Sequence, residues 1–120
     1  SFRVDVVRDR GVMARITDDG KIENIYRLQI MNATESTQHY QLNVSGIKGL
    51  EIEEEDRDDL ADKKVNKLIG VKPAQSRWLI VDLKIPDGSV ESGSHKIKFK
   101  IQSVDSKETV SENSVFLMPR

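Results

Sequence analysis

The chain has 120 residues, of which 37% are hydrophobic, 32% are charged and none is cysteine, and this length fits a single domain spanning residues 1–120. The absence of cysteine excludes disulfides, thiolate nucleophiles, zinc–thiolate sites and iron–sulfur clusters held by this chain. Nineteen basic and twenty acidic residues give a formal net charge of −1, which gives no reason to expect nucleic acid or an anionic membrane as a partner.

The first half of the chain has a hydrophobic period of two, which is typical of strands rather than helices. Strands are predicted over residues 2–7, 12–16, 22–31 and 39–45. Asp19-Gly20 predicts the hairpin turn before the third strand, because glycine accepts a positive φ without steric cost. The side chains expected to face the core are Tyr26, Leu28, Ile30, Tyr40, Leu42 and Val44.

The middle of the chain is different, because residues 51–62 carry eight acidic side chains and little that is apolar. We expect an exposed loop or a single helical turn there, with at most a short strand at Leu50 and Ile52 before it. Residues 65–71 are a further strand candidate. The turn that follows contains Pro73, which fixes φ and lacks an N–H.

Three stronger strands are predicted over residues 78–85, 94–104 and 109–118. Trp78 stands near the start of the first and is expected to pack inward. The alternation predicts that Lys96, Lys98 and Lys100 face solvent rather than form a nucleic-acid platform. The side chains expected to face the core are Leu79, Val81, Leu83, Ile85, Ile97, Phe99, Ile101, Val115 and Leu117.

Together these elements predict an all-β fold, an immunoglobulin-like antiparallel β-sandwich of seven or eight strands. No segment alternates a strand with an amphipathic helix, so a parallel α/β sheet is not expected. The absence of cysteine also rules out an antibody-type domain. Aliphatic packing is expected to hold the fold, since burying each Leu, Ile or Val contributes roughly 1.5–3 kcal/mol.

The acidic stretch is one candidate for a hard-cation site, because carboxylate oxygens are the ligands that calcium prefers. The spacing does not match an EF-hand loop, since no glycine follows the second or third acid. The main interpretation is a solvated, self-repelling loop, and calcium binding remains the alternative. The acids concerned are Glu51, Glu53, Glu54, Glu55, Asp56, Asp58, Asp59 and Asp62.

A copper or zinc site is a second candidate, because the chain has two histidines, His39 and His95. Met13, Met31 and Met118 could supply soft ligands for Cu(I). No His-x-His or His-x-x-Glu-His spacing is present. Scattered methionines are more often core residues that fill gaps.

The sequence contains no constellation typical of catalysis. There is no Gly-x-Ser-x-Gly elbow and no glycine-rich phosphate loop, and no pair of carboxylates stands out for acid–base chemistry. We therefore assign no catalytic, cofactor-binding or metal-binding residue, and expect neither enzymatic activity nor a small-molecule substrate for this domain.

The chain is expected to be an excised piece of a longer protein. It lacks an initiator methionine and the basic and apolar regions of a signal peptide. Its longest apolar run, Trp78–Val81, is far shorter than the roughly 20 residues of a membrane helix.

Three segments carry a more specific pattern, R-D-R … D-G-x-I-E-N-x-Y-x-L-x-I-x-N … Y-x-L-x-V-x-G. They lie in Val6–Val12, Asp19–Asn32 and Tyr40–Gly46. In this pattern the chain resembles the C-terminal domain of FixG/CcoG-type proteins, the accessory proteins of cbb-type cytochrome oxidase. Residues 71–86 and 93–103 are similar too, in a pattern that many bacterial immunoglobulin-like domains share.

The resemblance implies a parent protein in the inner membrane, with several membrane helices and ferredoxin-like cysteine motifs for [4Fe–4S] clusters. It implies a role in copper handling, such as reduction of Cu(II), during oxidase assembly. The immunoglobulin-like domain of the family follows the last membrane helix, which implies a periplasmic location. None of the cysteine motifs lies in this chain, so no redox residue is carried over.

Within the shared pattern we expect architectural roles. Asn24 and Asn32 are predicted to bond local backbone at strand ends. Arg8, Asp9 and Arg10 are predicted to form a network of charged pairs near a strand end.

Two hypotheses about function follow. The first is a non-catalytic periplasmic interaction or scaffold domain that docks an oxidase subunit or a copper chaperone through sheet edges or loops. The alternative is a metal-binding domain that presents copper or calcium to the redox core of the parent through the histidines, the methionines or the acidic stretch.

Overall fold

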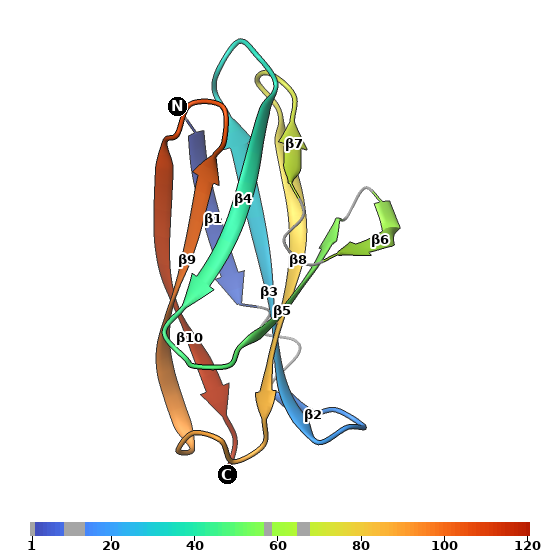
Figure 1. Cartoon of the computed structure of the whole chain (residues 1–120), viewed down its shortest axis with the longest axis vertical. Coiled ribbons are helices and arrows are strands. Elements are labelled where there is room, and N and C mark those ends of the chain that lie inside the picture. The colour runs from blue at the N-terminus through green and yellow to red at the C-terminus, as the bar shows by residue number, and fades with distance from the viewer. Residues whose placement is uncertain (1, 9–13, 57–58, 65–67) are drawn as a thin grey trace.

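A computed structural model describes residues 2–8, 14–56, 59–64 and 68–120. All regular secondary structure in these residues is β, in two antiparallel sheets (Figure 1). No helix in the described part of the chain is long and apolar enough to span a membrane. In chain order the strands are β1 (Phe2–Arg8), β2 (Arg15–Ile16), β3 (Lys21–Asn32), β4 (Gln38–Ser45), β5 (Glu51–Asp56), β6 (Asp59–Lys64), β7 (Ile69–Val71), β8 (Ser76–Pro86), β9 (Gly93–Ser103) and β10 (Thr109–Met118).

The two sheets stack face to face and confirm the predicted immunoglobulin-like sandwich (Figure 1). Sheet A has the strand order β1-β3-β8-β5-β6, with β2 paired beside β3, and sheet B has the order β10-β9-β4-β7. The long pair β3 and β8 forms the centre of sheet A, and β9 joins β10 to β4 in sheet B. The described residues contain ten strands rather than seven or eight, because the acidic stretch, expected as a loop or a helical turn, forms the two strands β5 and β6.

The core lies between the sheets and is built from alternate residues of the long strands. Every core-facing residue predicted on β3, β4, β8 and β9 is buried. Tyr26 of sheet A meets Phe99 of sheet B edge-on, with ring centroids 5.1 Å apart. Phe2 packs against Tyr40 in a tilted arrangement, with ring centroids 4.7 Å apart. Such ring pairs contribute about 0.5–1.5 kcal/mol beyond the burial of their area.

The two ends of the sandwich carry different parts of the chain. The loops 33–37, 72–75 and 104–108 gather at the end where β1 begins, which we call the loop end (Figure 1). Phe2 pairs there with Asn32, whose N–H donates to the carbonyl of Gln75 at 2.9 Å. The C-terminus lies at the opposite end, where Met118 pairs with Gly93.

The acidic stretch is not the loop or helical turn that was predicted. It forms β5 and β6, which pair with each other, and β5 also pairs with β8 from Glu51 opposite Lys84 to Asp56 opposite Leu79. The segment forms a strand because its backbone pairs with the edge of β8, which lies far away in the sequence. Of the later strand candidate, residues 65–71, residues 69–71 form β7, and residues 65–67 lie outside the described part.

Two predicted side-chain orientations are wrong. On β10 the buried residues are Phe116 and Met118, whereas Val115 and Leu117 are half-buried on the other face. Four apolar residues in succession make both faces of this strand equally hydrophobic, so alternation could not decide between them. Trp78 faces outward from sheet A and is 38% exposed, because its neighbour Leu79 takes the core position.

Candidate functional site

The strongest part of the shared sequence pattern lies on β3, where Asn24 reaches across to sheet B. Its Nδ2 donates to the carbonyl of Leu117 at 3.1 Å, and its Oδ1 accepts the N–H of Leu117 at 3.0 Å. The side-chain amide thus offers β10 the same donor and acceptor that a neighbouring strand would offer. The prediction of a local backbone partner is wrong for Asn24, since the two residues are 93 positions apart.

Tyr26 repeats this arrangement two residues further along β3. Its hydroxyl donates to the carbonyl of Val115 at 2.8 Å, while its ring packs against Phe99. Val115 and Leu117 are also two residues apart. Inward side chains at alternate positions of β3 therefore bond to backbone groups at alternate positions of β10. The residues of this pattern therefore join the two sheets.

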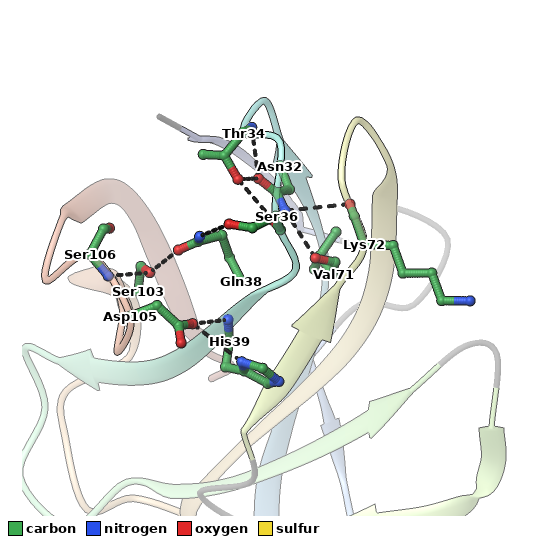
Figure 2. Close-up of polar contacts among 10 residues, drawn as sticks. All are labelled: Asn32, Thr34, Ser36, Gln38, His39, Val71, Lys72, Ser103, Asp105 and Ser106. Atoms are coloured by element: carbon green, nitrogen blue, oxygen red, sulfur yellow. Dashed lines mark hydrogen bonds and ion pairs between the residues drawn. The ribbon is translucent and has the colours of Figure 1, made fainter.

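Asn32 ties together three segments at the loop end (Figure 2). Its Nδ2 donates to the carbonyls of Ser36 and Val71, each at 2.9 Å, and lies 3.4 Å from the carbonyl of Lys72. Its Oδ1 accepts the N–H and the hydroxyl of Thr34 at 2.9 and 2.7 Å. The predicted local bonds are confirmed here, and bonds to β7 and the turn after it are added.

A second chain of polar contacts connects β4 to the loop between β9 and β10 (Figure 2). The buried hydroxyl of Ser103 donates to Oε1 of Gln38 at 2.7 Å and accepts the N–H of Ser106 at 3.2 Å. Nε2 of Gln38 donates to the hydroxyl of Ser36 at 3.1 Å. These groups satisfy one another, so their role is to fix the loops.

His39 lies beside this chain and is bound to Asp105 (Figure 2). The N–H of His39 donates to Oδ2 of Asp105 at 2.7 Å, and the ring Nδ1 lies 3.2 Å from the same oxygen. The bond from the His39 N–H is the main cause that holds the pKa of Asp105 below its usual range. Both side chains are exposed.

The predicted metal ligands do not come together. His39 bonds to the start of the loop after β9, whereas His95 lies at the other end of that strand, a separation of roughly 30 Å at about 3.3 Å per residue. Nε2 of His95 donates to the carbonyl of Glu91 at 2.6 Å. Met118 is buried and Met31 lies on the outer face of sheet A, while Met13 is outside the described residues.

The described acids of the predicted calcium site lie on both faces of β5. On β5, Glu51, Glu53 and Glu55 point outward, while Glu54 faces the core and is 3% exposed. The side chains of Asp56, Asp58, Asp59 and Asp62 lie outside the description. In the described part of the chain, no group of three or more His, Asp or Glu residues could hold a metal ion.

The predicted network of Arg8, Asp9 and Arg10 has no structural description. Asp9 and Arg10 lie outside the described residues. The backbone of Arg8 pairs with Tyr26 at the end of β1, but its side chain is not described.

A charged cluster that the sequence did not indicate lies on the outer face of sheet A. Glu23 is 4% exposed, and its carboxylate accepts a bond from Nε of Arg15 at 2.6 Å and lies 3.8 Å from Nζ of Lys84. Asp82 is the cross-strand neighbour of Ile25, so it stands diagonally beside Glu23. Only the cross-strand register could have brought these residues together.

The two acids of this cluster shift each other's pKa in opposite directions. Burial, with a hydrogen bond to Glu23, raises the pKa of Asp82 to about 8. The hydrogen bond from Asp82 lowers the pKa of Glu23, and Arg15 adds to this effect.

A shallow cleft of about 420 Å³ opens beside this cluster, between β8 and β5. It is lined by Lys21, Glu51, Glu53, Asp82 and Lys84, with Leu50 and Ile52 beneath. Nζ of Lys21 and Oε2 of Glu51 are 2.5 Å apart across its rim. Lys21 also lies 3.6 Å from Asp19, and Lys84 lies 3.8 Å from Glu23, so both lysines that line the cleft are already paired with acids.

Comparison with known families places this architecture. Residues 1–119 match the sequence model of a family described as "IG-like fold at C-terminal of FixG, putative oxidoreductase". The chain belongs to this FixG C-terminal domain family. The resemblance read from the pattern on β3 is thereby confirmed. None of the curated protein sequences that were compared matches the chain.

Solved structures share the sandwich fold of this chain. A FixG-related protein from Vibrio parahaemolyticus aligns with a TM-score of 0.79 and 23% identity, over 97% of this chain and 94% of that one. A family 123 glycoside hydrolase from Clostridium perfringens aligns at 0.59 with 8% identity, over 97% of this chain and 27% of the hydrolase. AvmM, which catalyses macrocyclization in alchivemycin A biosynthesis, aligns at 0.60 with 11% identity, over 99% of this chain and 89% of that one. At these identities the likeness shows the sandwich fold alone.

Proposed function

We propose that this FixG C-terminal domain is a non-catalytic interaction module in the periplasm. It belongs to a membrane-bound iron–sulfur protein that handles copper during assembly of a cytochrome oxidase. The [4Fe–4S] clusters lie elsewhere in that parent protein. The partner is an oxidase subunit or a copper chaperone.

One observation carries this proposal. Three polar residues of the family pattern, Asn24, Tyr26 and Asn32, form hydrogen bonds that hold the sandwich together. A domain whose distinctive polar side chains are internal supports a role in presenting a surface rather than in transforming a substrate. Its exposed faces and strand edges are then the parts that can contact a partner.

The placement of the ends gives this role an orientation. In a parent whose last membrane helix precedes this domain, the loop end faces the membrane, because β1 begins there. The long axis of 47 Å then carries the opposite end away from the bilayer. The outer faces of both sheets would be open to a partner beside the parent protein.

Deletion of this domain from the parent protein tests the proposal. We expect oxidase activity in isolated membranes to fall while the electron paramagnetic resonance signals of the clusters keep their intensity. Loss of the cluster signals would mean that the domain is needed to fold the parent. Unchanged oxidase activity with the parent present at its normal level would refute the interaction role.

A metal-binding function is not proposed beside this one. Its copper version needs His39 and His95 in one place, but His39, on β4, lies beside the end of β9 opposite to His95. Its calcium version needs the acids on one side, and the described ones lie on both faces of β5.

A further inference from the structure

The outer face of sheet B carries three lysines in a straight row on one strand. Lys96, Lys98 and Lys100 are all exposed, because the alternate residues of β9 fill the core. Side chains two residues apart on a strand are separated by about 6.6–6.8 Å. This lysine row is therefore about 13 Å long.

Among the described residues, no acid is paired with the lysine row. Lys100 lies between Asn43 of β4 and Ser111 of β10, and Lys98 lies between Ser45 and Asn113. These neighbours are exposed, small and uncharged. None of the three lysines forms an ion pair with any residue that the structure describes. The row differs in this respect from the outer face of sheet A, where Arg15 and Lys84 both lie beside Glu23.

A hollow of about 340 Å³ adjoins the row between β4 and β9. It is lined by Gln41, Leu42, Asn43, Lys100 and Gln102. Carboxamide and ammonium groups can donate hydrogen bonds, and an ammonium group donates its strongest bonds to carboxylates. The hollow is therefore suited to a carboxylate.

From this geometry we infer that the lysine row docks an extended acidic segment of the protein partner, with carboxylates at alternate positions and one of them in the hollow beside Lys100. An extended chain repeats every two residues, as β9 does, so such a segment can meet all three lysines in register. The inference deepens the interaction role proposed above and rests on it.

A protein segment fits this face better than a lipid surface. In the described part of sheet B, Tyr40, Phe99 and Phe116 all face the core. The face therefore offers no aromatic side chain to insert at a bilayer interface. A linear row of lysines with a fixed repeat also favours a ligand whose negative charges have the same fixed spacing. The headgroups of a fluid lipid layer have no fixed spacing.

Two synthetic peptides of equal composition test the inference. One alternates glutamate and threonine, and the other has all its glutamates in one block. Fluorescence anisotropy with the 120-residue chain should show that the alternating peptide binds roughly tenfold more tightly, and that salt weakens its binding. Equal affinity for the two peptides would overturn the inference.

A triple variant with Lys96→Gln, Lys98→Gln and Lys100→Gln should lose this preference, while the matching triple change to arginine should keep it. The control carries Lys48→Gln, Lys72→Gln and Lys107→Gln, which remove the same charge from exposed loop positions. Equal weakening by the control would show that only net charge matters and would refute the row as a site. Urea unfolding midpoints confirm that each variant folds.

Vesicles of phosphatidylglycerol and phosphatidylcholine separate a lipid surface from a protein segment. Binding to these vesicles that depends on the lysine row, without a preference between the peptides, would overturn the inference in favour of a membrane. In the parent protein, the glutamine triple variant should lower oxidase activity as deletion of the domain does. If deletion lowers activity and the triple variant does not, the interaction role stands and the lysine row is excluded from it.

Discussion

At the residue scale, the bonds between the side chains of Asn24 and Tyr26 and the backbone of β10 are the most specific feature of this chain. Both side chains come from sheet A, and both bond to main-chain groups of sheet B. The hydrophobic alternation of β3 predicted correctly that Tyr26 faces inward. It could not predict the partners, because Val115 and Leu117 lie about ninety positions away and become neighbours only when the sheets stack.

Replacing Asn24 with alanine should lower the free energy of unfolding by about 1–3 kcal/mol, because the N–H and carbonyl of Leu117 lose their partners. Urea denaturation measures the loss. Asn43→Ala, at an exposed position of β4, serves as the control and should change stability by less than about 0.5 kcal/mol. Equal losses in the two variants would contradict the role given to Asn24.

The pair Glu23 and Asp82 should make stability depend on pH. Because the folded-state pKa of Asp82 is raised to about 8, the folded chain holds a proton that the unfolded chain releases near pH 4. Stability should therefore fall as the pH rises from about 4 through about 8. The lowered pKa of Glu23 acts in the opposite direction only below about pH 4.5, where its stabilising contribution is lost as it becomes protonated.

Asp82→Asn should remove this decline, since the amide can still donate to Glu23 but cannot ionise. Urea denaturation at about pH 6 and about pH 9 measures the effect. The free energy of unfolding should differ by roughly 1–2 kcal/mol between the two pH values in the natural chain, and by much less in the variant. The side chain of Asp82 is 21% exposed, so solvent reduces the effect below that of a fully buried group. An unchanged slope in the variant would assign the dependence to other groups.

At the scale of elements, local patterns predicted strands well where one face is apolar and the other polar. On β3, β4, β8 and β9 this contrast decided both the strand and its orientation. On β5 nearly every side chain is acidic, and on β10 the last four residues are all apolar, so neither strand shows a contrast between its faces. The structure of both is decided by pairing with β8 and β9, which no local pattern records.

The orientation of β10 can be tested with two alanine variants. Phe116 is fully buried, so Phe116→Ala should cost about 3–5 kcal/mol of stability. Leu117 is half-buried on the other face, and Leu117→Ala should cost clearly less, about 1–2 kcal/mol. The reverse order would restore the orientation expected from the sequence.

At the scale of the whole molecule, the two outer faces differ in charge. On sheet A, Arg15 and Lys84 both lie beside Glu23, whereas sheet B presents a lysine row on β9 that is paired with no described acid. The net charge of −1 does not reveal this difference, because it adds the charges of both faces together. The carboxylate cluster and the hollow beside Lys100 both depend on cross-strand register, so neither could be located from the sequence.

Calorimetric titration of the chain with Cu(I), Cu(II) and Ca(II) should show no binding tighter than about millimolar, a strength within reach of incidental surface carboxylates. The physical reason is distance, since His39, on β4, lies beside the end of β9 opposite to His95. Micromolar binding abolished by His39→Gln or His95→Gln would revive the copper hypothesis, and Asn43→Ala provides a control without imidazole.

The contact between Asn24 and β10 also affects how these molecules behave toward one another. β10 is an edge strand of sheet B, and an edge strand with free N–H and carbonyl groups is a template for pairing with a second chain. Asn24 of sheet A binds the N–H and the carbonyl of Leu117, and Tyr26 binds the carbonyl of Val115. These bonds close the C-terminal half of this edge. Loss of Asn24 would therefore reopen a template for aggregation, and its effect would grow with protein concentration even where the monomer stays folded.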